Sequence, residues 1–243
     1  MTEFDKKYLQ QKKKQLIDSC LKCKGLDLTC NCYAQYFWEV AKIDAAIPLK
    51  YRNFTLTDIS FPESQKVVTS INQYIQDLEN HKEKGRGIYL WGNTGNAKTA
   101  LASIILMEAI KKGYTVYFTD LIKCMDHITR GWNDEEVRCT FTSKILKSHF
   151  LVIDDVGKEY KSKTGFTEAH FDMIFRERAN NLTPTILTSN LAPTDIATDY
   201  GRRLMSIFYE HSILIETTTV DYRKRVIQRQ NEKAIQSKKS DIT

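Results

Sequence analysis

The 243-residue sequence contains no apolar run that approaches the length of about 18 residues needed to span a membrane. Its first residues, MTEFDKKYLQQKKK, are polar and lack the apolar segment of a secretory signal. Only 4 prolines and 10 glycines occur, without repeats or low-complexity segments, which argues against a disordered or fibrous chain. We therefore expect a cytoplasmic protein that has no membrane partner.

No single sign of charge dominates, because 36 Lys and Arg residues face 30 Asp and Glu residues, for a net charge of +6. This excess permits contact with nucleic acid but does not require it. Hydrophobic residues make up 42% of the sequence and charged residues 27%, as in folded globular proteins. The length leaves room for one ordinary core and one small additional module.

The central part of the chain alternates helical patterns with short apolar runs. Ser64 can cap a helix whose apolar residues follow at helical spacing, and further helices are expected over about 98–112 and 167–180. Four β-branched runs predict strands, at 87–91, 114–119, 150–154 and 184–189. This alternation predicts an α/β fold with a parallel sheet flanked by helices.

A phosphate-binding loop follows the first predicted strand. The sequence GNTGNAKT joins that strand directly to a helix, which is the context of a P-loop. Lys98 would reach the β- and γ-phosphates of a nucleotide, and the Thr99 hydroxyl would bind Mg²⁺. The residues expected to surround the phosphates with backbone N–H groups are Gly92, Asn93, Thr94, Gly95, Asn96 and Ala97.

Ala97 departs from the usual P-loop pattern, which has glycine immediately before the lysine. Glycine suits that position because the backbone approaches phosphate closely, often at unusual dihedral angles. Alanine adds one methyl group, and we expect nucleotide binding to survive it. The alternative interpretation of the segment is a turn leading into an amphipathic helix.

Polar side chains stand at the ends of two later strands. Asp154 and Asp155 follow the apolar run from residue 150, and Asn190 follows the run from residue 184. In P-loop enzymes the first such carboxylate holds the Mg²⁺ shell and the second polarises an attacking water. An amide on a neighbouring strand can orient that water. Each residue alone could belong to a turn, but their order together predicts a site for Mg²⁺ with ATP or ADP.

Four of the six cysteines are clustered, in the pattern Cys20-x2-Cys23-x6-Cys30-x-Cys32. In a reducing compartment such a cluster indicates a metal site rather than disulfides. Zn²⁺ is the expected ligand, because it favours four thiolates in tetrahedral geometry. An iron–sulfur cluster and free thiols are the alternatives. The cluster follows a basic helical segment, 1–19, and precedes an aromatic-rich connector, 33–60.

The segments GNTGNAKT, FLVIDDVGKE, RERANNLTPTILTSN, YGRRLMS and DYRKR resemble the AAA+ ATPases of the bacterial helicase-loader group, the DnaC/DnaI type. The transposition helper IstB is a close relative of that group. The resemblance covers about residues 50–230. The cysteine cluster followed by AAIPLKYRNFTL resembles the loader subgroup.

The resemblance implies roles for individual residues. Lys98 and Thr99 match the Walker A positions, Asp154 and Asp155 match Walker B, and Asn190 matches sensor 1.

Further positions also match residues of the family. Arg203, with Arg202 beside it, stands where the family places an arginine that reaches a neighbouring subunit's nucleotide. Many loaders carry a second arginine four positions later, where this chain has Ile207. Arg223 matches sensor 2. Glu159 and Arg178 also match family positions, but no role follows for them from the sequence.

The resemblance also implies a domain plan and a function. Residues 1–50 would form a helicase-interacting module with the zinc site, 51–232 an AAA+ ATPase domain and 233–243 a basic tail. The implied function is ATP-dependent loading of a hexameric replicative DNA helicase onto single-stranded DNA, with self-association in the ATP state. The alternatives are an IstB-like transposition helper ATPase and a nucleotide-gated switch that hydrolyses little ATP.

A basic segment lies between the second and third predicted strands. Basic side chains interleaved with aromatic rings suit single-stranded DNA, through phosphate neutralisation and base stacking. The alternative is ordinary surface charge beside core aromatics. The residues concerned are Lys123, Arg130, Trp132, Phe141, Lys144 and Lys147.

Overall fold

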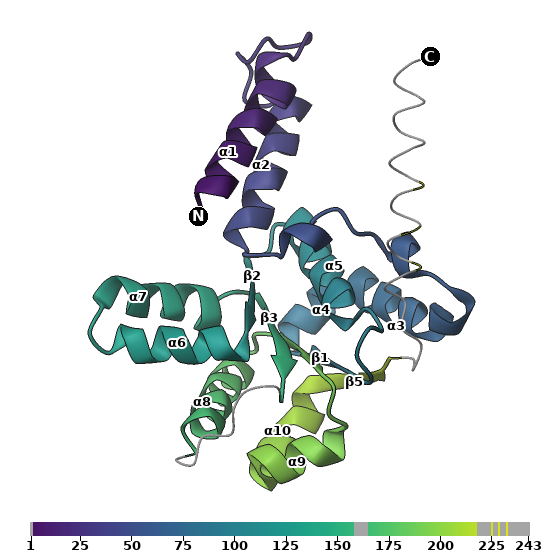
Figure 1. The fold of residues 1–243 in the computed structure, drawn as a ribbon, viewed down its shortest axis with the longest axis vertical. Helices are drawn as coiled ribbons and strands as arrows, with labels where there is room; N and C mark the ends of the chain where they lie inside the picture. The colour runs from purple at the N-terminus through teal and green to yellow at the C-terminus, as the bar shows by residue number, and fades with distance from the viewer. Residues whose placement is uncertain (1, 158–164, 218–224, 226–227, 229–231, 233–243) are drawn as a thin grey trace.

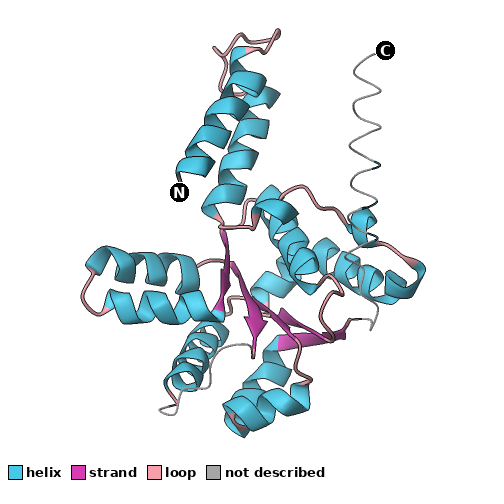
Figure 2. Ribbon diagram, viewed as in Figure 1, coloured by secondary structure: helices cyan, strands magenta, loops and turns pink. Residues whose placement is uncertain are grey.

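A five-stranded parallel sheet forms the centre of the computed structural model, which describes residues 2–157, 165–217, 225, 228 and 232 (Figures 1 and 2). The strand order is β2-β3-β4-β1-β5, so β4 lies between β1 and β3. All four strand pairs are parallel. The strands are β1 (Gly87–Trp91), β2 (Val116–Asp120), β3 (Phe150–Val156), β4 (Thr185–Ser189) and β5 (Ser212–Glu216).

Helices cover the sheet on both faces, which confirms the predicted α/β class (Figure 2). One face carries α3 (Gln65–Gln76), α4 (Leu78–Glu83) and α5 (Lys98–Lys111). The other is covered by α6 (Leu121–Gly131), α8 (Phe166–Asn180), α9 (Pro193–Tyr200), α10 (Arg202–His211) and a π-helical segment, Phe141–Leu146, which α7 (Glu135–Thr140) precedes.

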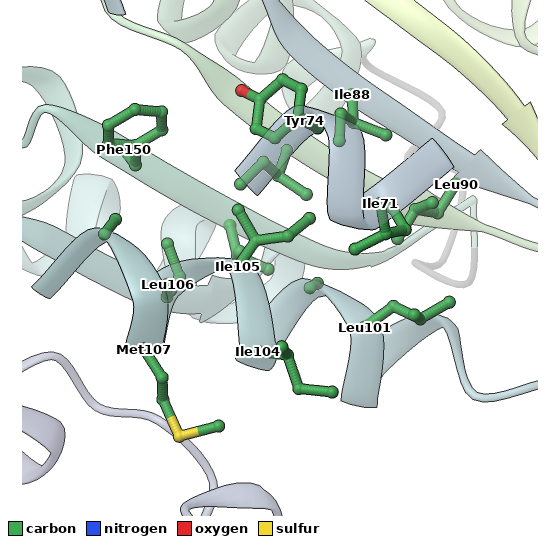
Figure 3. Close-up of a cluster of buried hydrophobic side chains, with 14 of the residues drawn as sticks. Ile71, Tyr74, Ile88, Leu90, Leu101, Ile104, Ile105, Leu106, Met107 and Phe150 are labelled. Atoms are coloured by element: carbon green, nitrogen blue, oxygen red, sulfur yellow. The ribbon is translucent and has the colours of Figure 1, made fainter. Parts of the chain in front are cut away.

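Successive strand residues alternate between two cores. On β1, Ile88 and Leu90 join the first core while Tyr89 joins the second, and all three are fully buried. Side chains of a strand point alternately to opposite faces, so a strand covered on both sides reads as a continuous apolar run. Figure 3 shows Leu101 and Ile105 of α5 packed in the first core with the β1 residues. Because the sheet is packed on both faces, the positions of its strand ends are well defined.

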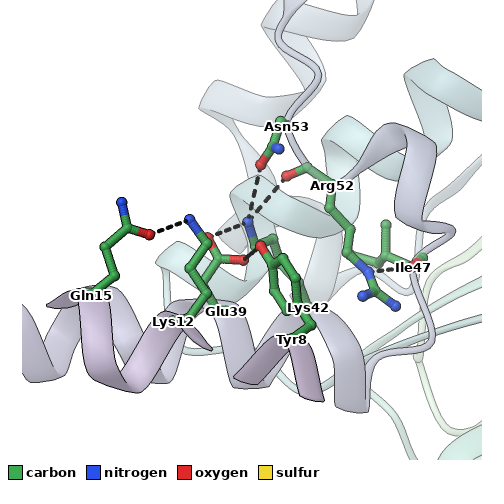
Figure 4. Close-up of polar contacts among 8 residues, drawn as sticks. All are labelled: Tyr8, Lys12, Gln15, Glu39, Lys42, Ile47, Arg52 and Asn53. Carbon is green, nitrogen blue, oxygen red and sulfur yellow. Dashed lines mark hydrogen bonds and ion pairs between the residues drawn. The ribbon is translucent and has the colours of Figure 1, made fainter. Parts of the chain in front are cut away.

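The N-terminal residues form a helical hairpin that projects from the sheet (Figure 1). It consists of α1 (Glu3–Lys13), continued by a π-helical turn over Lys14–Asp18, and α2 (Asn31–Asp44). The Tyr8 hydroxyl of α1 donates a hydrogen bond to Glu39 of α2 at 3.0 Å (Figure 4). Lys42, which is almost fully buried, donates to the same carboxylate at 2.8 Å. The Tyr8 bond joins the two helices, and Lys42, which lies in α2 itself, neutralises the carboxylate that accepts it.

The base of the hairpin is attached to the core by polar and aromatic contacts. Arg52 donates to the Ile47 carbonyl at 2.8 Å and pairs with Asp5 of α1 at 3.2 Å. The ammonium of Lys111, at the end of α5, lies 5.6 Å from the ring centroid of Trp38 in α2. The backbone N–H of Phe118 on β2 donates to the Ala45 carbonyl at 2.8 Å. The hairpin is therefore anchored to the outer strand of the sheet and to α5.

Several elements differ from the sequence-based expectations. The connector expected over 33–60 begins with α2, which belongs to the hairpin. The helices α9 and α10 and the strand β5 were not predicted. Ser64 does precede a helix, but its hydroxyl donates to the carbonyls of Ile59 and Phe61 and closes the preceding turn. Among the described residues, no helix is both long and apolar enough to cross a membrane.

Candidate functional site

The polar strand ends predicted from the sequence meet at one edge of the sheet. β1 leads into the P-loop, β3 carries Asp154 and Asp155, and β4 ends immediately before Asn190. Because the strands are parallel and β4 lies between the other two, their carboxyl ends are neighbours. The structure thereby brings the P-loop, the carboxylate pair and the amide together.

The loop between β1 and α5 has an unusual backbone. Gly92, Gly95 and Ala97 have φ angles of 133°, 92° and 66°, all in the left-handed half of the map. A Cβ atom on Gly92 would lie 2.7 Å from the Thr217 hydroxyl oxygen, so glycine is required there. Left-handed residues in such a loop turn successive N–H groups inward, which makes a concave site for anions.

Ala97 is the N-terminal cap residue of α5 and makes no side-chain capping bond. The left-handed conformation costs a residue with a Cβ roughly 1–2 kcal/mol more than it costs glycine. Its methyl group packs against the first core. The alanine therefore adopts the backbone shape that glycine usually supplies, and the N-terminus of α5 remains directed at the loop.

Lys98 is buried at the centre of the loop. Its ammonium donates to the carbonyls of Gly92 and Asn93 at 2.7 and 2.8 Å. It also donates to the side-chain oxygens of Asn96 and Asn190, each at 3.0 Å. The cation is thus held by the loop and by the end of β4. A phosphate entering the loop would replace some of these neutral acceptors with charged oxygens, which bind an ammonium more strongly.

Thr99 and Asp154 are in direct contact. The Thr99 hydroxyl lies 3.0 and 3.2 Å from the two carboxylate oxygens of Asp154. Asp154 is largely buried and also accepts a hydrogen bond from Thr188 of β4 at 2.5 Å. A hydroxyl beside a carboxylate is a suitable oxygen donor set for Mg²⁺. Sequence reasoning missed Thr188, although its place two residues before Asn190 on the predicted strand was a usable signal.

A small apolar hollow opens beside the P-loop. Its wall comes from the turn before α3, from α3, from the P-loop and α5, and from the residue after β5. Its apolar lining lies next to the place where the loop would bind a phosphate. Sequence reasoning missed this hollow, because its wall joins distant segments. The lining residues are Ile59, Ser64, Val67, Val68, Asn96, Ala97, Leu101 and Thr217.

The structure describes only some of the positions that match arginines of the family. Arg223 lies outside the described residues, and so does Glu159. Arg203 belongs to α10, but its side chain and that of Arg202 are not described. Ile207, on the next turn of α10, packs against the second core. Ile207, at the position where many loaders have a second arginine, thus contributes to the packing of the second core.

Arg178 is fully buried and has a structural environment. Its guanidinium donates to the Ile145 carbonyl at 2.7 Å and to the Ser148 carbonyl at 3.1 Å, in the segment before β3. It also donates to the Pro184 carbonyl and the Thr185 hydroxyl, at the start of β4. Burial lowers the pKa of Arg178 to about 9, so it remains a cation at neutral pH. It ties the beginnings of two central strands together.

The four clustered cysteines converge at the far end of the hairpin. Their sulfur atoms all lie within 4.8 Å of one another, with 3.9 Å between Cys20 and Cys30 and 3.4 Å between Cys23 and Cys32. Four thiolates at about 2.3 Å from a tetrahedral ion would lie about 3.8 Å apart. The residues therefore fit a single metal ion such as Zn²⁺.

The environment of the cluster favours the thiolate form of one cysteine, Cys23. Partial burial would raise the pKa of Cys23, but hydrogen bonds from Cys32 and from the backbone N–H groups of Gly25 and Asp27 outweigh it and lower that pKa to about 6. Burial raises the pKa of Cys32 to about 12, and the hydrogen bond with Cys23 acts in the same direction. The thiolate is the form that binds metal. Cys124 is buried in the second core, and Cys139 is exposed and lies outside the cluster.

The basic and aromatic residues considered for single-stranded DNA have separate environments. Lys123 and Arg130 pair with Asp120 and Asp126 on or next to their own helix, α6. Lys144 pairs with Asp44 at the end of α2. Phe141 is buried in the second core, so it is a packing residue.

Trp132 differs from these residues because its indole is exposed. It makes an edge-on contact with Phe166, with ring centroids 5.9 Å apart.

The sequence matches the model of a known protein family. The model of the family described as IstB-like ATP binding protein matches residues 42–225, which is more than half of the sequence. The match includes the P-loop, the strand with Asp154 and Asp155, and Asn190. The cysteine cluster precedes it.

Two curated relatives have different named roles. The replicative helicase loader DnaI of Bacillus subtilis is 24% identical over 146 residues, which are 59% of this chain and 45% of that protein. An ATP-binding protein of insertion sequence IS5376 from Geobacillus stearothermophilus is 29% identical over 161 residues, which are 62% of this chain and 61% of that protein. The match therefore spans less than two thirds of each relative.

Solved structures share the fold. The DnaC helicase loader superposes with a TM-score of 0.62 at 27% identity, over 70% of this chain and all of that one. The replication initiator DnaA bound to AMPPCP and single-stranded DNA superposes with a TM-score of 0.60 at 22% identity, over 77% of this chain and 56% of that one. The family match, the loader likeness and the P-loop site agree: the chain belongs to the IstB-like ATP-binding protein family, as an AAA+ protein related to the DnaC/DnaI helicase loaders.

Proposed function

We propose that the protein binds Mg·ATP at this sheet edge and uses it to load a hexameric replicative DNA helicase onto single-stranded DNA. The observation that carries the proposal is that consecutive residues of the P-loop each bond a polar residue at the end of another strand, Lys98 with Asn190 and Thr99 with Asp154. These groups come from three strand ends, and their chemistry is that of a nucleotide-hydrolysing site.

Each residue has a distinct role in the proposed site. The P-loop and Lys98 bind the phosphates, and the base occupies the apolar hollow beside Ala97. Thr99 and Asp154 hold Mg²⁺, which supplies charge neutralisation at the phosphates when it is bound. Asp155 polarises the attacking water, and Asn190 orients it.

Two arginines complete the proposed site. Arg203 reaches the nucleotide of a neighbouring subunit and neutralises charge that develops on the γ-phosphate. Arg223 contacts the nucleotide of its own subunit. Because Arg203 acts on the nucleotide of a neighbouring subunit, the proposal requires the protein to self-associate in the ATP state.

The hairpin provides the proposed helicase-docking surface. Around the cysteine cluster, Leu21, Leu26 and Leu28 are exposed to 95%, 88% and 72%. A large apolar side chain on a projecting tip indicates a partner surface. Zn²⁺ bound by the four cysteines would hold these leucines in place, since it supplies folding energy to a loop that has little core of its own. The cluster is structural in this proposal, not catalytic.

A mutation pair tests the nucleotide site. Lys98→Met should weaken binding of a fluorescent ATP analogue by at least tenfold, because the loop loses its only charge inside the phosphate cradle. Lys111→Met, at the exposed end of the same helix, is the matched control and should bind as the unmodified protein does. Equal affinity in Lys98→Met and the unmodified protein would contradict the site.

A second experiment tests the partner. The replicative helicase should co-purify with the chain, and the triple change Leu21→Ser, Leu26→Ser and Leu28→Ser should abolish this. Leu182→Ser, at an exposed leucine of the ATPase core, is the control. Capture of a transposase in place of the helicase would instead support the transposition-helper alternative, which the 29% identity to the insertion-sequence protein keeps open.

A third experiment separates an ATPase from a nucleotide-gated switch. The left-handed Ala97 in the P-loop motivates this comparison. Steady-state phosphate release should fall sharply in Asp155→Asn if Asp155 polarises the attacking water. Equal rates of phosphate release in Asp155→Asn and the unmodified protein would instead support a nucleotide-gated switch.

A further inference from the structure

The two adjacent carboxylates of β3 lie at an irregularity of the strand. Ile153 pairs with Leu187 and Val156 pairs with Ser189, so two residues of β3 face the single residue Thr188 of β4. This is a β-bulge, which re-aims the side chains that it contains. Asp155 within it has a φ angle of 57°. In a regular strand the side chains of Asp154 and Asp155 would point to opposite faces of the sheet.

The Thr188 hydroxyl closes the bulge from the neighbouring strand. Its oxygen accepts the backbone N–H of Asp155 at 2.9 Å. Its proton goes to a carboxylate oxygen of Asp154 at 2.5 Å. A hydroxyl has one proton to donate and lone pairs to accept with, so one side chain fixes both acidic residues at once. Thr188 is fully buried, and water therefore does not substitute for it.

We propose that Thr188 is a positioning residue for the two carboxylates of β3, Asp154 as the Mg²⁺ ligand and Asp155 beside it. Thr99 approaches Asp154 from α5 and Thr188 approaches it from β4, so the carboxylate is oriented from two sides. The bond to the Asp155 backbone sets the direction in which the second carboxylate leaves the bulge. This role rests on the proposed function, because it concerns the Mg²⁺ that accompanies the nucleotide.

The inference predicts a specific effect on magnesium dependence. Thr188→Val keeps the shape of the side chain and loses both hydrogen bonds, whereas Thr188→Ser keeps the hydroxyl. Changing an outer-shell partner of a metal ligand typically costs 10–100-fold in metal affinity. In Thr188→Val, the magnesium concentration for half-maximal binding of a fluorescent ADP should rise by about that factor.

The test measures nucleotide affinity across a magnesium titration and again in EDTA. In EDTA the affinity of Thr188→Val should stay within about twofold of the unmodified protein, because the P-loop is unchanged. Thr188→Ser should restore the magnesium dependence. The matched control is Thr119→Val, a buried threonine on β2 whose hydroxyl donates to the Asp120 carbonyl. Hydrogen exchange at the Asp155 amide, measured without ligand, should be faster only in Thr188→Val.

The outcomes are separable. An unshifted magnesium titration in Thr188→Val would overturn the positioning role alone. So would an equal loss of affinity in EDTA, or an equal shift in Thr119→Val, because either indicates a general structural effect. Failure of the unmodified protein to bind nucleotide under any condition would overturn the proposed function, and this role with it.

Discussion

Replacing Arg178 with methionine should strongly destabilise the fold without any direct contact with the candidate site. The guanidinium is fully buried and satisfies oxygens of the segment before β3 and of the start of β4. Methionine fills a similar volume but donates no hydrogen bond. The change therefore leaves several buried acceptors, among them the carbonyls of Ile145 and Ser148, without their donor.

The magnitude follows from the bonds that are lost. Each buried acceptor left without a donor costs about 1 kcal/mol or more, and removing one partner of a buried charged network costs about 3–5 kcal/mol in total. Methionine also removes the cost of burying a cation, the effect that lowers the pKa of Arg178. We therefore expect the lower end of that range, about 3 kcal/mol. For a chain of this size this corresponds to a fall of about 6–12 °C in Tm.

Thermal unfolding followed by circular dichroism measures the effect. Arg176→Met is the control on the same helix, since that side chain is partly exposed and pairs with Asp172 one turn away. An exposed pair contributes little, so its Tm should change by less than about 2 °C. If Arg178→Met lost less than about 1 kcal/mol, the reasoning that these carbonyls depend on the guanidinium would be refuted.

Two further predictions concern other parts of the molecule. Burial lowers the pKa of His81, which stacks on Tyr74 with ring centroids 4.1 Å apart, so the folded state favours the neutral ring. Stability should therefore fall as the pH drops below about 6.5, the unfolded value, and His81→Phe should make Tm less dependent on pH between 7 and 5.5; an unchanged dependence would contradict this. The purified chain should carry one zinc ion by elemental analysis, lost in Cys23→Ser and kept in Cys139→Ser, and a chelator should unfold the cysteine loop; iron, or no metal, would count against a zinc site.

The sequence predicted the candidate site better than the elements around it. Convergence of Lys98, Asp154 and Asn190 was predictable because each follows a strand whose apolar run is unmistakable, and parallel strands end at one edge. The bulge at Asp155 was not predictable from periodicity, since its register depends on the hydroxyl of Thr188 on another strand. The wall of the apolar hollow was missed for the same reason, because Ile59 and Thr217 are far apart in the sequence.

The elements that the sequence missed have a weak apolar signal of their own. In α2 only Cys32, Lys42 and Ile43 are buried, and polar contacts with α1 and with the segment after it hold the helix in place. The strand β5 lies at an edge, and only Ser212 and Ile215 of its five residues are buried, so its apolar signal is weak. In both cases the tertiary partner, not the local pattern, decides the structure.

The bond from Phe118 to the Ala45 carbonyl has a consequence for how the protein avoids aggregation. β2 is an outer strand, and an outer strand with unsatisfied N–H groups is a template on which another molecule can add a strand. Ala45, which directly follows α2, accepts a hydrogen bond from the middle of this strand. The hairpin thus shields the sheet as well as carrying the cysteine cluster. Removing the hairpin would expose an edge strand of the α/β core to pairing with other molecules.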